Sequence, residues 1–491
     1  MANKKLIIND LSGGLNKDYP APLIAPNQLS VADNIVYRQG EWVKRGGYTQ
    51  PYSPQPANDI LEIVDYVRKD GTSKLYVATK AAINELSGTS WTSRKTVTTR
   101  TEIDKWWFAE IGDSVYATNG VDNIQKATTG AFSNATWDTS TDSAGETGIS
   151  VTRASIILAL NSRLWFFNTT DSANGASPFA MQWTDALDYD RVEPDNILLI
   201  DDNQTPIISA GVLTNNFISV YKQDQVVVVQ NTGNPVASIR FRFPNGILAP
   251  KAWTKVPGGH FFVGLDGFYL FSGAAPTAIG DDRITSHFFS ILTTNTDARK
   301  NLYCFTDWFH REVHIIIPTD DNYTVMPTRQ IIYNWQYNTW SESDLGAWCG
   351  FYRFRTSTTP TVLLGGSSRE IWQIGADSGG STDDGNPIAT KIRTKALANF
   401  PDQKTFEGKD YIQTNIIKTD ALPTTSTVKV GTSDYGTEAP SFVSSAPITA
   451  TDGLAPYADL EPATGRYISV EVENFNTISE FQIEWQEAGE E

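Results

Sequence analysis

The sequence has few of the residues that usually carry catalysis or covalent cross-links. Its 491 residues include only two cysteines and four histidines. Two cysteines exclude a disulfide scaffold. Cys304 and Cys349 both lie in apolar runs, so we expect buried free thiols, with a single bridge between them as the alternative. No CxxC, HExxH, calcium-loop, GxSxG or Lys-containing phosphate-loop pattern occurs.

Basic residues are too few for a nucleic-acid-binding surface. Lys and Arg total 39 against 56 Asp and Glu, a formal net charge of −17. An acidic surface repels phosphates, which argues against sequence-specific DNA binding. The acidity has two interpretations: it keeps a large protein soluble, or part of it lines a surface past which a polyanion slides.

Long apolar runs are also missing. The start, MANKKLIINDL, lacks the apolar core of a secretion signal. No stretch approaches the roughly 18 apolar residues that a membrane helix requires. We therefore expect a chain made and folded in a cytoplasm, without membrane insertion.

Aromatic and turn-forming residues are abundant instead. The chain has 14 Trp, 19 Tyr, 23 Phe and 36 Gly, a composition that favours pleated strands joined by tight turns. Seven segments share one pattern, an apolar run, a polar turn and a second apolar run, which predicts β-hairpins. They are 74–86, 114–127, 163–183, 216–230, 260–273, 312–340 and 361–375.

The hairpins start roughly 40 to 55 residues apart, which is the period of a four-stranded propeller blade. We predict an all-β chain with a β-propeller of about seven blades at 49–375. Weaker runs, such as 103–112 and 154–161, would supply the other strands. A set of β-sandwiches is the competing architecture, because it would contain the same strands and turns.

The remaining segments predict further domains. Residues 1–48 form an N-terminal arm that could close the propeller, with Ile35–Tyr37 and Trp42–Val43 supplying the closing strand. Residues 376–387 are polar and Gly-rich, typical of a linker. Residues 388–491 alternate polar and apolar side chains, which predicts a smaller β-sandwich ending in a short acidic tail. Short helices are expected at 26–35 and 281–292, the second capped by Thr285 or Ser286.

No catalytic, cofactor or metal site is predicted. His310 and His314 are four apart, but in a strand their Cα atoms would be about 13 Å apart, too far for one ion. Paired acids, such as Asp201-Asp202, lie in turns and do not form the opposed carboxylates of a glycosidase. The Trp-rich phrases at 105–108 and 334–340 could stack sugars or bases, but packing between blades is the simpler interpretation. Two small basic clusters, Lys44-Arg45 and Arg240 with Arg242, could pair with acids on a neighbouring subunit.

The arm carries the most specific pattern in the chain. It has Gly13-Gly14-Leu-Asn, a Pro-rich stretch, Asn34, and Lys44-Arg45 before Gly46-Gly47-Tyr48. This pattern resembles the N-terminus of tail hub and nozzle (tail tubular) structural proteins of short-tailed bacteriophages. We therefore predict structural or partner contacts for the residues of the pattern, which are Gly13, Gly14, Asn34, Lys44, Arg45, Gly47 and Tyr48.

The resemblance implies a β-propeller with added β domains that assembles as a homo-oligomeric ring of six. Such a ring would lie in the virion tail below the head–tail adaptor, extend the DNA-ejection channel and dock tail fibres or spikes, with DNA passing the lumen unbound. It implies no enzymatic activity and no cofactor. The alternative function is a glycan-binding or glycan-degrading propeller protein of the virion, which requires convergent carboxylates and exposed tryptophans in the central mouth.

Overall fold

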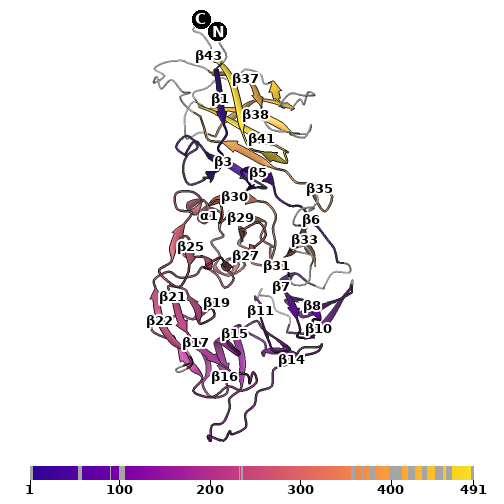
Figure 1. The fold of residues 1–491 in the computed structure, drawn as a ribbon, viewed down its shortest axis with the longest axis vertical. Coiled ribbons are helices and arrows are strands. Elements are labelled where there is room, and N and C mark those ends of the chain that lie inside the picture. The colour runs from indigo at the N-terminus through magenta and orange to yellow at the C-terminus, as the bar shows by residue number, and fades with distance from the viewer. Residues whose placement is uncertain are drawn as a thin grey trace.

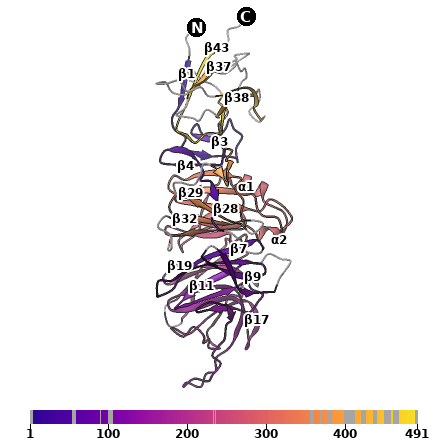
Figure 2. The same cartoon turned by 90° about the vertical axis from the view of Figure 1, so that its right-hand side faces the viewer.

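The structure is a computed structural model of the chain. It describes residues 4–52, 58–88, 90–98, 105–231, 233, 236–354, 360–366, 370–375, 382–397, 412–418, 426–433, 439–447, 457–459 and 467–487. These residues form a propeller disc with a smaller β-sandwich on one edge, so that the molecule is elongated (Figures 1 and 2). No helix among the described residues is long and apolar enough to cross a membrane.

Seven antiparallel blades of four strands each make the propeller. Six of them are separate sheets, and blade six is part of a ten-stranded sheet that continues into the C-terminal domain. From the axis outward, blade one has β7 (Ile60–Val67), β8 (Ser73–Thr79), β9 (Ala82–Ser87) and β10 (Ser90–Thr96). Blade two has β11 (Trp107–Ile111), β12 (Ser114–Thr118), β13 (Gln125–Ala127) and β14 (Ser133–Asn134). Blade three has β15 (Val151–Leu160), β16 (Arg163–Asp171), β17 (Gly175–Trp183) and β18 (Ile197–Leu199). Blade four has β19 (Ile207–Thr214), β20 (Phe217–Lys222), β21 (Val226–Gln230) and β22 (Ser238–Phe243). Blade five has β23 (Trp253–Val256), β24 (Gly259–Val263), β25 (Phe268–Phe271) and β26 (Thr277–Ile279). Blade six has β27 (Tyr303–Asp307), β28 (Glu312–Ile317), β29 (Arg329–Asn334) and β30 (Thr339–Ser343).

The seventh blade combines strands that are far apart in the sequence. It consists of β31 (Cys349–Arg353), β32 (Thr361–Gly365), β33 (Ile371–Gly375) and, outermost, β6 (Tyr48–Thr49). Tyr48 pairs with Ile374, and its ring stacks on Trp372 with 4.8 Å between centroids. Because β31 also contacts β7, the ring of blades is closed. The arm thus supplies the closing strand, but from Tyr48–Thr49 and not from the expected residues 35–37 or 42–43.

Those expected residues belong to a bridge between the propeller and the sandwich. β4 (Ile35–Arg38) and β5 (Glu41–Lys44) pair with each other, and β5 pairs with β42 (Thr477–Ile478). β3 (Gln28–Asp33) pairs with β36 (Lys391–Thr394) on one side and with blade six on the other, through Asp33 and Glu342. β2 (Gly14–Leu15) runs parallel to β3.

The sandwich is built from two sheets, and the arm adds a strand to each. One sheet has the order β1-β43-β37-β40 and the other continues from β3 through β36, β41, β38 and β39. The bounds are β1 (Lys4–Ile8), β37 (Ile412–Lys418), β38 (Thr427–Ser433), β39 (Ser441–Pro447), β40 (Tyr457–Asp459), β41 (Tyr467–Glu473) and β43 (Phe481–Glu487). Both ends of the described chain therefore lie at the pole farthest from the propeller (Figure 1).

Two local expectations were wrong or only partly right. Residues 26–35, expected to be helical, contain β3 and the start of β4 instead, because β3 pairs with β36. Asn34 has a left-handed φ of 57° and bends the chain between the two strands. The expected linker contains a hairpin, β34 (Thr382–Asp383) with β35 (Asn386–Pro387), in its described part. Residues 376–381 of that linker, and 488–491 of the acidic tail, lie outside the described residues.

Two short helices lie between blades five and six, α1 (Thr285–Ile291) and α2 (Thr296–Arg299). The first agrees with the helix expected near 281–292, but neither Thr285 nor Ser286 caps it. Instead, the Asp18 carboxylate of the arm accepts hydrogen bonds from the backbone N–H groups of Ser286 and His287, which satisfies two donors that the helix cannot pair internally.

The core is rich in the aromatic residues that the sequence contains in excess. Trp106, Trp165, Trp340 and Trp348 are fully buried, as expected if the Trp-rich phrases pack between blades. Fully burying one large apolar side chain stabilises a fold by roughly 1.5–3 kcal/mol. Both cysteines are buried free thiols, and burial raises the pKa of each.

Candidate functional site

The residues singled out in the arm gather where the propeller meets the sandwich. Asn34 is at the centre of this junction and is 3% exposed. Its Oδ1 accepts hydrogen bonds from Arg45 Nε (3.0 Å), Ser343 Oγ (3.1 Å) and the Asp344 N–H (3.2 Å). Its Nδ2 donates to the Ala389 carbonyl at 2.8 Å. One side chain thus joins the arm, the end of blade six and the start of the C-terminal domain.

Arg45 is the main charged group of the junction. Its guanidinium donates to both carboxylate oxygens of Asp383, at 2.9 and 2.6 Å, and to Asp344 at 3.2 Å. A planar guanidinium matches two carboxylate oxygens, which makes such pairs geometrically specific. Burial alone would lower the pKa of Arg45, but the hydrogen bonds and charge of Asp383 raise it above its ordinary value. Arg45 is therefore paired within its own chain.

The other five residues of the arm pattern, Gly13, Gly14, Lys44, Gly47 and Tyr48, surround Asn34 and Arg45. Lys44 donates its backbone N–H to Asn476 of the sandwich at 2.7 Å, and burial lowers the pKa of its side chain. Gly47 is buried between β5 and β6, and Tyr48 begins the closing strand. Gly13 and Gly14 lie against neighbouring chain: a Cβ on Gly13 would come within 2.7 Å of Asn27, and one on Gly14 within 3.0 Å of the Trp340 nitrogen. Arg242, from the second predicted basic cluster, pairs with Asp202 of its own chain at 3.1 Å.

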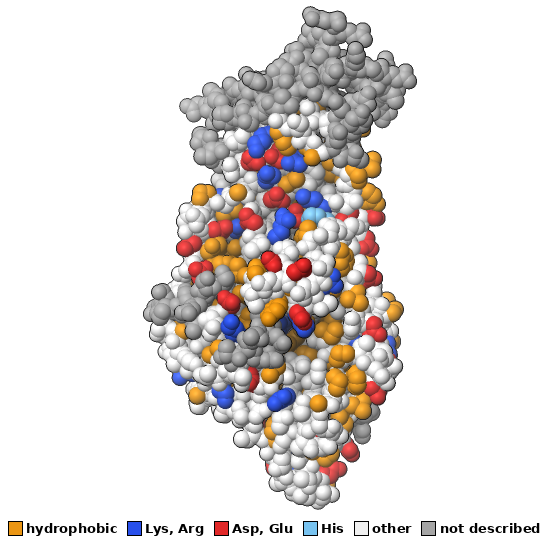
Figure 3. Space-filling model, turned by 180° about the vertical axis from the view of Figure 1, so that it is seen from behind, with side chains coloured by type: hydrophobic (Ala, Val, Ile, Leu, Met, Phe, Trp, Pro, Cys, Tyr) orange, Lys and Arg blue, Asp and Glu red, His pale blue; other side chains and the backbone are white. Residues whose placement is uncertain are grey.

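Charged side chains of both signs gather over the junction on the face opposite Figure 1 (Figure 3). A cavity of about 800 Å³ lies beneath the β4–β5 hairpin, between it and blades six and seven. Its walls include Arg38 and Lys44 from the hairpin, the turn 307–312 of blade six, Gln330 of β29 and Ile374 of β33. The cavity is therefore formed by the arm together with the last two blades.

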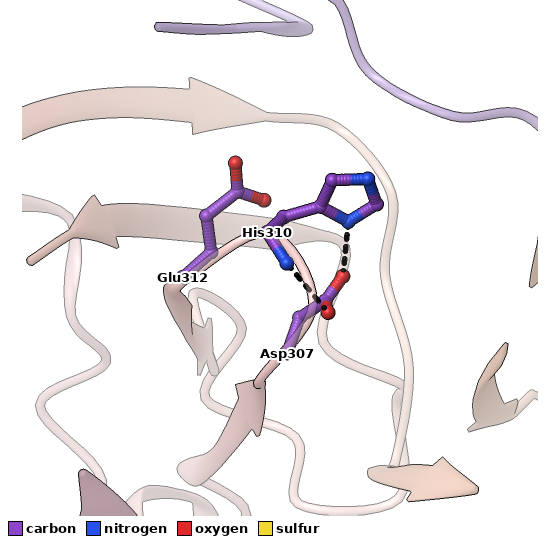
Figure 4. Close-up of side chains that lie close together, drawn as sticks. All are labelled: Asp307, His310 and Glu312. Atoms are coloured by element: carbon purple, nitrogen blue, oxygen red, sulfur yellow. Dashed lines mark hydrogen bonds and ion pairs between the residues drawn. The ribbon is translucent and has the colours of Figure 1, made fainter. Parts of the chain in front are cut away.

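One wall of this cavity, the cavity cluster, consists of Asp307, His310 and Glu312 (Figure 4). One ligand atom from each of the three side chains lies within 4.8 Å of the others. Asp307 Oδ1 accepts the backbone N–H groups of Phe309 and His310, at 3.0 and 3.2 Å, and Oδ2 is 2.6 Å from His310 Nδ1. The turn between β27 and β28 thus brings the three side chains together.

Glu312 is fully buried and is held from two further directions. Arg38 donates to both of its oxygens at 2.8 Å, and His314 Nε2 lies 3.6 Å from Oε2. Burial alone would raise the pKa of Glu312, but the Arg38 charge and the hydrogen bonds from His314 and Arg38 hold it well below its ordinary value. Gln330 Oε1 is in turn 3.0 Å from His314 Nδ1. The Arg38–Glu312 pair therefore fastens the arm hairpin to blade six.

Sequence reasoning missed this cluster because it compared His310 with His314 along one strand. The useful spacing was Asp-x-x-His-x-Glu across a tight turn, in which residues 307 and 312 face each other as paired strand ends. The Asp307 carboxylate followed by three residues that it can cap was the available signal.

The central mouth of the propeller is a second, smaller cavity of about 300 Å³. Trp107, Trp253 and the exposed Trp308 line it, together with Lys251 and Lys255. Lys251 Nζ lies 3.9 Å from the Trp107 ring centre and 2.7 Å from Glu62. The nearby Lys105 is buried, which lowers its pKa to about 8, and donates to the Trp348 carbonyl.

This mouth presents cations and aromatic rings. Its lining residues include no Asp or Glu. The adjacent Glu62 is buried, accepts from Tyr303 Oη at 2.7 Å and pairs with Lys251. Across the part of the chain that the structure describes, the mouth therefore lacks the two convergent carboxylates that glycoside hydrolysis requires.

No protein-family model matches the chain, and no curated protein sequence matches it. Among solved structures, the chain is similar to BamB from Moraxella catarrhalis, with a TM-score of 0.39, 10% identity, and 76% of this chain and 99% of that chain covered. YCF48 from Cyanidioschyzon merolae gives a TM-score of 0.40 and 11% identity, covering 68% and 99% of the two chains. PorZ of Porphyromonas gingivalis gives 0.35 and 11%, covering 75% and 45%. The chain is a β-propeller protein, and similarities this distant indicate nothing about its function.

Proposed function

We propose that this protein is a structural subunit of a bacteriophage tail, in the hub or nozzle position, and acts without enzymatic activity. Six copies form a ring below the head–tail adaptor, extend the channel through which DNA leaves, and present docking surfaces for fibres or spikes. The observation that carries the proposal is the arm pattern Gly13-Gly14, Asn34, Lys44-Arg45 and Gly47-Tyr48.

The contacts of this pattern suit a structural subunit. Asn34 and Arg45 connect three parts of the chain through buried hydrogen bonds, and Tyr48 supplies the strand that closes the propeller. A subunit in a ring that transmits force needs its domains held rigidly, and a junction formed by buried charged hydrogen bonds is specific in geometry. The arm pattern is thus engaged in holding the domains together.

The chemistry of the described residues also favours a structural role over hydrolysis. The cluster of Asp307, His310 and Glu312 is beneath the arm hairpin and not in the central mouth. The formal charge of −17 suits a ring whose channel DNA must pass without binding, because acidic surfaces repel phosphates. The ring channel in this proposal lies between subunits, and the basic mouth of each propeller lies away from it.

Imaging of the purified protein with its adaptor tests the proposal. We expect six-fold rings with an open pore in negative stain, and a protein that is monomeric or weakly associated before the adaptor is added, as measured by light scattering. Localisation of the chain to the tail in an image of the virion would be the strongest support. A stable monomer or trimer with adaptor present, or a ring lumen that is neutral or basic, would refute the proposal.

A second candidate, binding of glycans on the host surface, has one observation in its favour. Trp308 is 42% exposed at the central mouth, where Tyr352 and Lys255 also line the cavity, and exposed tryptophan rings stack on sugars. Retention on immobilised host polysaccharide that is lost in Trp308→Ala, with no ring in negative stain, would favour this candidate.

A further inference from the structure

The cavity cluster of Asp307, His310 and Glu312 has the composition of a metal site. It offers one imidazole nitrogen and two carboxylate oxygens, a set that suits zinc and related divalent transition metals. The atoms lie within 4.8 Å of one another. Ligands of a tetrahedral zinc ion with bonds of about 2.1 Å are about 3.4 Å apart, so the three side chains need only small rotations to share one ion.

Hydrogen bonds hold two of the three ligands near their positions before any ion binds. Two backbone N–H groups fix the Asp307 carboxylate, and Arg38 holds Glu312 through both oxygens. Asp307 and Glu312 are buried, so their charges are poorly solvated by water. Preorganised, partly desolvated ligands favour cation binding, because little ordering remains to be done when the ion arrives.

Two further side chains, His314 and Gln330, lie behind the cavity cluster and support it. His314 lies against Glu312, and Gln330 contacts His314. Gln330 is 2% exposed, lines the same cavity, and its Nε2 has no hydrogen-bond partner among the described residues. A buried amide end without a partner costs about 1–3 kcal/mol. An additional ligand or bound water in the cavity would satisfy it.

The charges around the cluster permit one divalent cation. Asp307 and Glu312 are two carboxylates and Arg38 is one guanidinium, so the formal charges of these three side chains sum to about −1. The Arg38 guanidinium weakens binding but does not exclude it, because each carboxylate oxygen has two acceptor positions. The cavity of about 800 Å³ provides an entry path and room for water ligands.

We propose that Asp307, His310 and Glu312 bind a divalent transition metal ion of the zinc type in this cavity. The ion would add a link at the place where Arg38 fastens the arm hairpin to blade six. Metal binding here is independent of ring formation, so either proposal can fail without the other.

The test uses untagged full-length protein stripped with a chelator. Isothermal titration with Zn²⁺ is expected to show one site per chain, and a thermal scan is expected to show that Zn²⁺ raises the melting temperature. Mg²⁺ should give no comparable response in either measurement. Asp307→Asn keeps an oxygen that can cap the turn, and His310→Ala removes the imidazole; each should lower zinc affinity by at least about tenfold.

A matched control comes from another histidine paired with a buried carboxylate. His287 lies 2.6 Å from Glu342 outside the cavity cluster, and His287→Ala should leave zinc affinity unchanged. The near-ultraviolet circular dichroism of each variant without metal shows whether it is folded. Zinc binding that is absent from the folded wild type, or equal in wild type, Asp307→Asn and His310→Ala, would overturn the proposal.

Discussion

Removing the Asn34 side chain is the sharpest test of how the propeller and sandwich are joined. Its amide makes four hydrogen bonds, to Arg45, Ser343, the Asp344 N–H and the Ala389 carbonyl. Each contributes about 1 kcal/mol net, and a buried group left unpaired costs more. Because such neighbouring terms are not strictly additive, we expect Asn34→Gly to lower the free energy of unfolding by about 3 kcal/mol.

The backbone at Asn34 requires its own control. With φ at 57°, the folded backbone at this position is about 1 kcal/mol less favourable for alanine than for glycine. Asn34→Ala should therefore be destabilised more than Asn34→Gly. Asn338 has a φ of 53° in an exposed turn. Asn338→Gly should be nearly neutral, and Asn338→Ala should lose only the backbone contribution.

Urea unfolding followed by tryptophan fluorescence measures these differences. The 14 tryptophans report on the propeller and the junction together. Asn34→Gly should also uncouple the two parts, so that a broadened or two-step transition replaces a single one. If Asn34→Gly lies within about 0.5 kcal/mol of Asn338→Gly, the junction hydrogen bonds do not hold the domains together and the argument fails.

Three further expectations concern the propeller and the cavity. Gly350→Ala should lower the melting temperature by several degrees, because a Cβ at this position would be 2.2 Å from the Phe305 ring. Gly130→Ala should leave the melting temperature unchanged, because the space around Gly130 is open. Equal melting temperatures for the two variants would contradict this reasoning. Glu312 has a lowered folded pKa, so its stabilisation is complete above the unfolded pKa near 4.3 and is lost as the pH falls through the folded value. Calorimetry below pH 5 should show a shallower acid loss in Glu312→Gln, and parallel curves would refute the role of the Arg38 pair. Both thiols should react with a thiol reagent only after denaturation, since both are buried; rapid reaction in the folded protein would show that the structure opens.

The propeller could be predicted because its middle strands carry a local signal. The seven expected hairpins are the second and third strands of the seven blades. Such strands are covered by neighbouring blades on both faces, as in β21, where four successive valines are buried, so their sequence is a continuous apolar run. Outer strands such as β14 are two exposed residues long and leave no pattern to detect.

The role of the arm could be predicted only in outline. β1 pairs with β43, and β6 pairs with β33, across more than 300 residues of sequence. No local periodicity encodes a partner so distant, and the helix expected at 26–35 was wrong because β3 has its partners in the C-terminal domain. The Gly and Arg residues of the arm were recognised as a pattern, but not the contacts they make.

The cavity cluster could not be predicted from the sequence for a related reason. Its members come from one turn, yet the cavity exists only because β4 and β5 cover that turn. Glu312 owes its lowered pKa to Arg38, which is 274 residues away in the chain.

The pairing of β1 with β43 has a consequence for how the chain is made. Lys4 of β1 lies opposite Trp485 of β43, so β1 has no partner from β43 until almost all the described residues have been synthesised. The closing strand β6 likewise has no partner until β33 has been synthesised. Contacts of such high sequence separation slow folding, and an unpaired strand edge invites association with other chains. Expression yield should therefore depend on chaperones and on translation rate more strongly than the stability of the finished fold suggests.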